Sequence, residues 1–120
     1  MIAELGRIRL HVVRMGQRGT PVVMLHGAFV GNLATWGLTV APTLAESHRV
    51  VVYDLRGHGK SERATQGYEV ESQVEDLRAL LSALAFEEPV DLVGHSYGAV
   101  IALAFALEYT AKVRRLVLVD

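Results

Sequence analysis

Five consecutive residues, Gly94-His95-Ser96-Tyr97-Gly98, carry the clearest chemical signal in this sequence. The pattern Gly-x-Ser-x-Gly is weakly specific on its own, so the flanking segments decide its meaning. An apolar run, Val90 to Val93, precedes it, and a run of helix-forming residues, Val100 to Leu107, follows it. This order predicts a strand, a sharp turn with Ser96 at its apex, and a helix. A serine hydroxyl in that position is exposed to substrate and lies near helix N–H groups that can stabilise an oxyanion.

Gly94 and Gly98 have a steric role in this prediction. The turn brings the backbone close to itself, so a side chain at either position would collide with the neighbouring strand or helix. The alternative interpretation of Ser96 is a serine that merely ends a strand. The flanking elements favour the chemical interpretation, in which Ser96 is a nucleophile for acyl transfer.

Further apolar runs predict the strands that position this turn. Val22 to Gly27 predicts a central strand, and the β-branched runs Arg49 to Tyr53 and Val113 to Val119 predict two others. Near the amino terminus, Ile2 to Leu5 and Ile8 to Val13 predict a hairpin with a glycine-containing turn.

Two segments besides the one after Ser96 predict helices. Ala34 to Glu46 has apolar residues at helical spacing, although Pro42 indicates a helix that is broken or begins late. Glu69 to Phe86 carries an apolar stripe on one face. The helix after Ser96 is apolar almost all round, which predicts packing between the sheet and other elements. Strands alternating with helices predict an α/β fold with a mostly parallel sheet, helices on both faces and a working edge at the carboxyl ends of the strands.

Composition limits the size and the partners of the protein. A chain of 120 residues, 51% of them apolar, is long enough for one domain and too short for two. A net charge of -1 without a basic cluster argues against nucleic acid and membrane surfaces as partners. The chain has no cysteine, which excludes disulfides and thiolate metal sites. An acidic residue near the amino terminus does not fit a signal peptide, and we expect a cytoplasmic protein.

Three motifs stand in order, each at the end of a predicted strand: His26-Gly27, the loop Asp54-x-Arg56-Gly57-His58-Gly59-x-Ser61, and Gly94-His95-Ser96-Tyr97-Gly98. Together they resemble the amino-terminal part of the α/β-hydrolase family, in particular small serine esterases and related carbon-carbon bond hydrolases. The resemblance covers nearly all of residues 1–120. It implies one α/β-hydrolase domain, of which this chain is the amino-terminal part, truncated after about the sixth strand.

The resemblance also implies roles for individual residues. Ser96 is the nucleophile, the N–H of Tyr97 is one oxyanion donor, and the N–H of Ala28 or Phe29 is the other. Serine at this position argues against the dehalogenase and epoxide hydrolase branches, which form an alkyl-enzyme through a carboxylate. In the family, the catalytic acid and histidine follow strands that would lie beyond Asp120. Because a serine without a base is a poor nucleophile, we expect the chain alone to be nearly inactive.

Residues of the chain itself offer few replacements for the missing acid and base. Asp120, at the end of the last predicted strand, is a candidate for the acid. His58 lies at the same edge of the sheet as Ser96, but the family's loop at that position is structural, which argues against His58 as the base. We expect His26 to hold the oxyanion loop and His95 to point toward packing. The last two histidines, His11 and His48, lie in or near strands, where a structural role is expected.

Other polar and aromatic residues near the motifs have two interpretations each. Asp54 and Arg56 could bind a metal or a substrate carboxylate, but a loop salt bridge or turn hydrogen bond is favoured, because no second carboxylate lies close in sequence. Trp36, Phe29 and Tyr97 could line an acyl pocket, although aromatic residues at helical spacing are more often part of the core, and Phe29 and Tyr97 are the two worth testing. We expect neither a metal nor a cofactor.

Two functional hypotheses remain open. The first is a serine hydrolase that acts on a small ester or related carbonyl compound through an acyl-enzyme, with the acid and base supplied by a segment or partner chain that completes the strands. The second is a non-catalytic protein, either a truncated homologue or a subunit that a partner chain completes at the open edge of the last strand.

Overall fold

A six-stranded sheet forms the centre of the computed structural model, which describes residues 1–29 and 31–120. The strands are β1 (Ile2–Glu4), β2 (Arg9–Met15), β3 (Pro21–Leu25), β4 (Arg49–Tyr53), β5 (Val90–His95) and β6 (Val113–Val119). Their order across the sheet is β1-β2-β4-β3-β5-β6. Four strands run parallel to one another: β4, β3, β5 and β6. β2 is antiparallel to β4, and β1 is antiparallel to β2. The predicted hairpin, the central position of β3 and the mostly parallel sheet are all confirmed.

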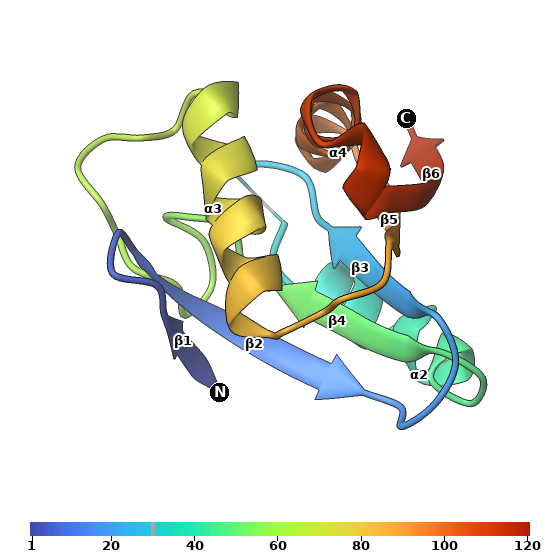
Figure 1. Ribbon diagram of the computed structural model, residues 1–120. Coiled ribbons are helices and arrows are strands. Elements are labelled where there is room, and N and C mark those ends of the chain that lie inside the picture. Colours follow the sequence, from blue (N-terminus) through green and yellow to red (C-terminus); the bar gives the residue numbers. More distant parts are fainter. Residues whose placement is uncertain (30) are drawn as a thin grey trace.

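Helices cover both faces of this sheet, as the sequence predicts. α3 (Val70–Ala83) and α4 (Tyr97–Glu108) lie on one face, above the strands in Figure 1, and α1 (Ala34–Gly37) and α2 (Ala41–Leu44) pack against the other face. A short 3₁₀ helix, η1 (Thr110–Lys112), precedes β6. Successive side chains of β4 point to opposite faces of the sheet, so this strand contributes to both core layers. Val51 and Tyr53 pack with α3 and α4, and Val50 and Val52 pack with α1 and α2.

The first helical segment is broken, in agreement with the position of Pro42. Pro42 lies in the first turn of α2, where the missing backbone N–H has no helical partner to lose. The long amphipathic helix predicted from Glu69 to Phe86 is present as α3, and its apolar stripe, which includes Val74 and Leu77, is buried. Gln73 and Asp76 on the same helix are also buried, which the stripe did not predict.

The prediction that α4 packs on all sides is wrong for its outer face. Ile101 and Phe105 are buried against the sheet, whereas Val100 and Leu107 are exposed, Leu107 to 74%. No element among residues 1–29 and 31–120 covers this face, and the apolar end of the edge strand β6 is exposed as well. The apolar composition of α4 therefore indicates a surface that favours burial, but the described residues do not cover the outer part of that surface.

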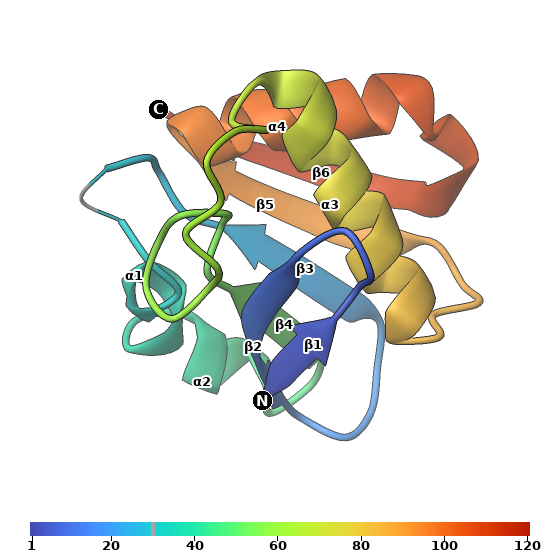
Figure 2. The ribbon, with the colours of Figure 1, turned by 90° about the vertical axis from the view of Figure 1, so that its left-hand side faces the viewer.

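The parallel strands bring three loops to one edge of the sheet. Figure 2 shows the turn after β3, the loop after β4 and the start of α4 gathered at its left-hand side. The carboxyl ends of parallel strands are the usual place for an active site in such folds. Within the described part of the chain, no helix is long and apolar enough to cross a membrane.

Candidate functional site

Ser96 is the single residue that connects β5, which ends at His95, to α4, which begins at Tyr97. Its backbone has φ 54° and ψ -119°, a conformation that non-glycine residues rarely adopt. The Ser96 N–H donates to the Val119 carbonyl oxygen at 3.0 Å, so the turn is anchored to β6. The residue is exposed. The predicted strand, turn and helix are thus present, with the serine at the apex.

Two glycines permit this turn to pack closely against the rest of the sheet. A side chain on Gly98 would place its Cβ 2.6 Å from the Leu25 carbonyl oxygen, which is too close for any residue except glycine. A Cβ on Gly94 would overlap the backbone of Gly98 in the same way. The start of α4 therefore lies directly against the end of β3, as the steric argument from the sequence required.

The turn after β3 lies beside Ser96. A Cβ built on Gly27 would be 3.3 Å from the Ser96 Cβ. A cavity of about 370 Å³ opens between the two turns. Ala28, Phe29, Ser96 and Tyr97 line it, so the structure brings together four of the five site residues that the sequence singled out.

The backbone N–H groups around this cavity differ in what they bind. Those of Ala28 and Tyr97 have no acceptor among residues 1–29 and 31–120. The Phe29 N–H, by contrast, donates to His58 Nε2 at 2.8 Å. Of the two candidates for the second oxyanion donor, Ala28 is therefore the one whose N–H can turn to a ligand.

Asp120, the candidate acid, does not line the cavity. It is exposed at the end of β6 and follows Val119, whose carbonyl oxygen binds the Ser96 N–H. Among the described residues, the Asp120 side chain forms no hydrogen bond. Its position at the end of β6 is compatible with the predicted role as catalytic acid. Among the described residues, no contact assigns the Asp120 carboxylate a structural role instead.

His58 and Tyr68 complete one wall of the cavity, together with Gln73. The Nδ1 of His58 lies 2.9 Å from the Arg56 carbonyl oxygen, to which it donates, and Nε2 accepts the Phe29 N–H. Both ring nitrogens are committed to the backbone in the neutral imidazole. This geometry agrees with a structural role for His58.

His26 ties the turn after β3 to the loop after β4. Its Nδ1–H donates to the Gly27 carbonyl oxygen at 2.6 Å, and its Nε2 accepts the Leu55 N–H at 3.0 Å. Burial lowers the pKa of His26 below its ordinary value, outweighing the hydrogen bond to Gly27. The side chain is fully buried and neutral, which fits the prediction that it holds the oxyanion loop.

Asp54 organises the loop that follows β4. Its carboxylate accepts the Leu33 N–H at 2.7 Å and the Lys60 N–H at 2.9 Å, and it pairs with His11 at 2.9 Å. Burial acts to raise the pKa of Asp54, but these hydrogen bonds outweigh it and hold the pKa below its ordinary value. A side chain on Gly59 would overlap the carboxylate. Every contact of Asp54 is structural.

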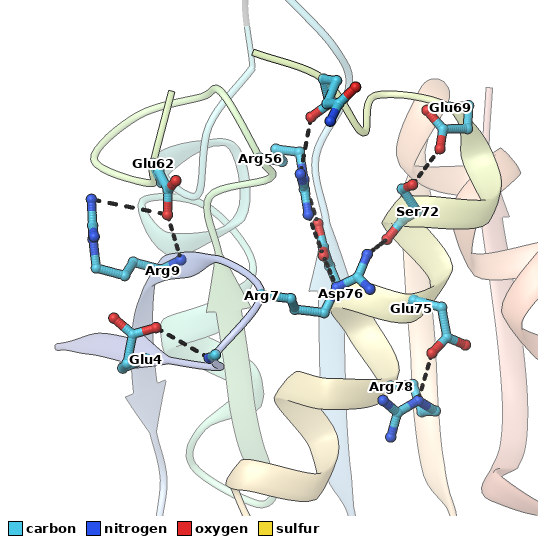
Figure 3. Close-up of polar contacts among 12 residues, drawn as sticks. Glu4, Arg7, Arg9, Arg56, Glu62, Glu69, Ser72, Glu75, Asp76 and Arg78 are labelled. Carbon is cyan, nitrogen blue, oxygen red and sulfur yellow. Dashed lines mark hydrogen bonds and ion pairs between the residues drawn. The ribbon is translucent and has the colours of Figure 1, made fainter. Parts of the chain in front are cut away.

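Arg56 is likewise committed to the fold. Its Nε and a terminal nitrogen donate to the two carboxylate oxygens of Asp76 at 2.9 and 2.8 Å, and Arg7 approaches the same carboxylate at 2.9 Å (Figure 3). Asp76 is only 1% exposed. The loop salt bridge favoured from the sequence is present, with a partner on α3 that the sequence did not identify. No cluster of metal-ligating side chains occurs within residues 1–29 and 31–120.

The aromatic residues near the motifs divide as follows. Phe29 is 96% exposed with φ 69°, and Tyr97 is half-buried with its hydroxyl donating to the Tyr68 carbonyl oxygen at 2.7 Å. Trp36, which belongs to α1, packs against the core layer between that helix and the sheet and donates its indole N–H to the Leu25 carbonyl oxygen. Phe29 and Tyr97 line the cavity, and Trp36 does not.

Gln73 and Tyr68 were missed in the sequence. Both line the cavity, and Gln73 is buried. The signal for Gln73 was available, because a polar residue directly beside the apolar stripe of an amphipathic helix is unusual. Tyr68 precedes the helix and carried no periodic signal.

Comparison with known proteins agrees with this arrangement. A family model described as the alpha/beta hydrolase fold matches residues 20–120. The chain is 41% identical to the 2-hydroxy-6-oxo-2,4-heptadienoate hydrolase of Pseudomonas putida, over 97% of this chain and 44% of that protein. It is 36% identical to a soluble epoxide hydrolase of Corynebacterium, over 98% of this chain and 40% of that protein.

Solved structures give the same result. Cfl2 from Burkholderia cenocepacia superimposes with a TM-score of 0.92 and 34% identity, over 99% of this chain and 40% of that one. The chain thus spans about two fifths of the length of these relatives. The family match, the relatives and the fold together show that the chain belongs to the α/β-hydrolase family.

Proposed function

We propose that this chain is the nucleophile-bearing part of a serine hydrolase that acts on an ester or related carbonyl substrate. The observation that carries the proposal is the position of Ser96, which is exposed at a strained turn and lines a cavity. Beside it lie the N–H groups of Ala28 and Tyr97, which have no acceptor among residues 1–29 and 31–120. Donors placed where negative charge develops stabilise the transition state of acyl transfer.

The reaction follows from these positions. The Ser96 hydroxyl oxygen attacks the substrate carbonyl carbon, and the carbonyl oxygen takes up negative charge between the N–H groups of Ala28 and Tyr97. Collapse of this intermediate expels the leaving group, which takes a proton, and leaves an acyl group on Ser96. Water then attacks the acyl carbon, releasing the acid product and restoring the hydroxyl.

A base must accept the Ser96 proton during attack, and His58 is the one histidine among the described residues that lines the Ser96 cavity. His58 and His26 are both held by two backbone hydrogen bonds. We therefore assign the base, a histidine, to a segment or partner chain outside the 120 residues. Asp120 remains our candidate for the acid, and a small molecule is the partner proposed for the cavity, rather than nucleic acid or a membrane.

The type of substrate follows from the nucleophile. The substrate named for the Pseudomonas putida relative carries a 6-oxo group, which supports a carbonyl substrate. Another relative is a soluble epoxide hydrolase. Epoxide hydrolases of this family attack through a carboxylate. Serine at position 96 therefore favours a carbonyl compound over an epoxide.

Labelling with an active-site fluorophosphonate tests the proposal. In the intact protein, including whatever supplies the base, we expect the probe to modify Ser96 and to be located there by peptide mapping. Ser96→Ala should abolish labelling, and Ser82→Ala, which changes an exposed serine on α3, should not. An intact protein that is folded but unlabelled at Ser96 would favour the non-catalytic hypothesis.

A further inference from the structure

Gln73 is a buried polar residue that the hydrolytic reaction does not use. It lies in α3, is 2% exposed and lines the Ser96 cavity. Its backbone N–H donates to Glu69, but its side-chain amide has no hydrogen-bond partner among residues 1–29 and 31–120. Burial of an amide without partners is unfavourable, so such a group usually serves a ligand or a water molecule.

The Gln73 amide is not sealed inside the protein. Within the described part of the chain, Tyr53 Oη is the one fully enclosed side-chain polar atom that lacks a partner. The Gln73 amide lacks a partner without being fully enclosed, so it keeps contact with open space. The space that Gln73 lines is the cavity beside Ser96.

The other polar side chains around this cavity are already committed. Both nitrogens of His58 bind backbone groups, the Tyr68 hydroxyl donates to Ala64, and the Tyr97 hydroxyl donates to Tyr68. Apart from Ser96, Gln73 is therefore the lining side chain that can offer both a donor and an acceptor to a ligand.

The charge of the cavity restricts what Gln73 can bind. Its described lining contains no lysine or arginine, and both ring nitrogens of His58 are occupied by backbone groups. Among residues 1–29 and 31–120, the lining therefore offers no Lys or Arg to pair with a carboxylate. A hydroxyl or a ketone, in contrast, matches a neutral amide, which accepts from the first and donates to the second.

We propose that the Gln73 side-chain amide determines specificity by hydrogen-bonding a hydroxyl or ketone oxygen on the acyl part of the substrate. This inference rests on the proposed function, because the cavity is taken as the place where the acyl group binds to Ser96. The substrate class is an acyl compound with a mainly apolar chain and a second, neutral oxygen in addition to the carbonyl that Ser96 attacks.

Binding of matched, unreactive amides tests this proposal without requiring turnover. The ligands are N-methylpentanamide and its 3-hydroxy and 3-oxo derivatives, titrated into the intact, isotope-labelled protein and followed by nuclear magnetic resonance. We expect each oxygenated ligand to bind about tenfold more tightly than the parent, the effect of one added hydrogen bond. The side-chain NH₂ resonances of Gln73 should shift with the oxygenated ligands and not with the parent.

Two variants provide the comparison. Gln73→Leu should bind all three amides with equal affinity, whereas Gln17→Leu, the same substitution at an exposed position between β2 and β3, should keep the tenfold preference. If Gln73→Leu does not fold, the shift of the Gln73 resonances in the wild type decides. Equal binding by the wild type, unshifted Gln73 resonances, or a preference that persists in Gln73→Leu would overturn the proposal.

Fluorophosphonate labelling of Ser96 separates this proposal from the proposed function. Labelling without any ligand preference would refute the role of Gln73 and leave the serine hydrolase intact. A ligand preference without labelling would support the Gln73 contact and refute Ser96 as the nucleophile.

Discussion

The backbone N–H of Phe29 donates a 2.8 Å hydrogen bond to Nε2 of His58. Because Nδ1 of the same ring donates to the Arg56 carbonyl oxygen, the imidazole joins the turn after β3 to the loop after β4. This contact occupies the Phe29 N–H, and the two contacts together occupy both ring nitrogens of His58, which argues against Phe29 as an oxyanion donor and against His58 as the base. It leaves the N–H groups of Ala28 and Tyr97 available beside Ser96.

Replacement of His58 distinguishes a structural histidine from a base. We expect His58→Ala to reduce kcat/KM of the intact enzyme by about tenfold or less, since only the hydrogen bond that positions Phe29 is lost. Loss of a general base would instead lower the rate by about 10² to 10⁴. Steady-state kinetics with a p-nitrophenyl ester make the distinction, and a loss in the larger range would assign the base to His58.

The strained backbone of Ser96 predicts an unusual order of stabilities. At φ 54° and ψ -119° a Cβ is unfavourable, so Ser96→Gly should be more stable than Ser96→Ala by about 1 kcal/mol. At Ser82, in the last turn of α3, the order should reverse, with glycine less stable than alanine by up to about 1 kcal/mol. Urea unfolding of the four variants measures both differences. Alanine more stable than glycine at position 96, as expected at position 82, would show that Ser96 is not strained.

The buried pair of Arg56 and Asp76 predicts a large cost for removing one partner. Asp76→Ala leaves the Arg56 guanidinium buried without its carboxylate and should lower the free energy of unfolding by about 3–5 kcal/mol. The half-exposed pair of Glu75 and Arg78 on the same helix (Figure 3) is the matched control, and Arg78→Ala should cost less than about 1 kcal/mol.

A double variant tests whether the cost is that of an unpaired charge. Replacing both partners, in Arg56→Met with Asp76→Leu, should recover part of the stability that Asp76→Ala loses, because no buried charge remains. Chemical denaturation of the single and double variants provides the comparison. A double variant less stable than Asp76→Ala would mean that packing around Arg56, rather than its charge, dominates.

His26 predicts a loss of stability in mild acid. Its pKa is lowered in the folded protein by burial, so the unfolded chain takes up a proton first as the pH falls through about 6.5. The stability that His26 contributes is complete above that pH and is lost progressively below it, until the folded protein also binds the proton. The slope from this one group is at most about 1.4 kcal/mol per pH unit.

Unfolding by urea at several pH values between about 7.5 and 5 measures this slope. His26→Gln cannot take up the proton, so its unfolding free energy should depend less steeply on pH than that of the wild type. Parallel pH profiles for the two proteins would contradict the assignment.

The place of the candidate site was predictable because parallel strands end at one edge of a sheet. Three motifs at the ends of β3, β4 and β5 therefore had to meet, and they do. The choice between Ala28 and Phe29 was not predictable, because it depends on which N–H the lone pair of His58 binds. That contact spans 29 residues and leaves no periodic mark in the sequence.

The polar residues of α3 show the same limit. Apolar spacing identified the buried stripe of the helix, but burial of Asp76 depends on the partner Arg56 at another position in the chain. Gln73 is buried at the wall of a cavity that it lines together with Ser96 and Tyr97, which lie at the turn before α4 and at its start. For the outer face of α4 the error was the reverse, since burial was predicted and the face is exposed. Composition indicates which surface favours burial, but it does not indicate what covers that surface.

The central claim is that Ser96 carries the acyl group, and trapping that intermediate tests it most directly. The intact enzyme is mixed with p-nitrophenyl butanoate, quenched in acid within the first turnover and digested for mass spectrometry. We predict a burst of p-nitrophenolate and a butanoyl group on the peptide that contains Ser96, both absent in Ser96→Ala. Ester turnover that persists in Ser96→Ala, or a wild-type enzyme that turns over without a burst and without acylated Ser96, would contradict the account.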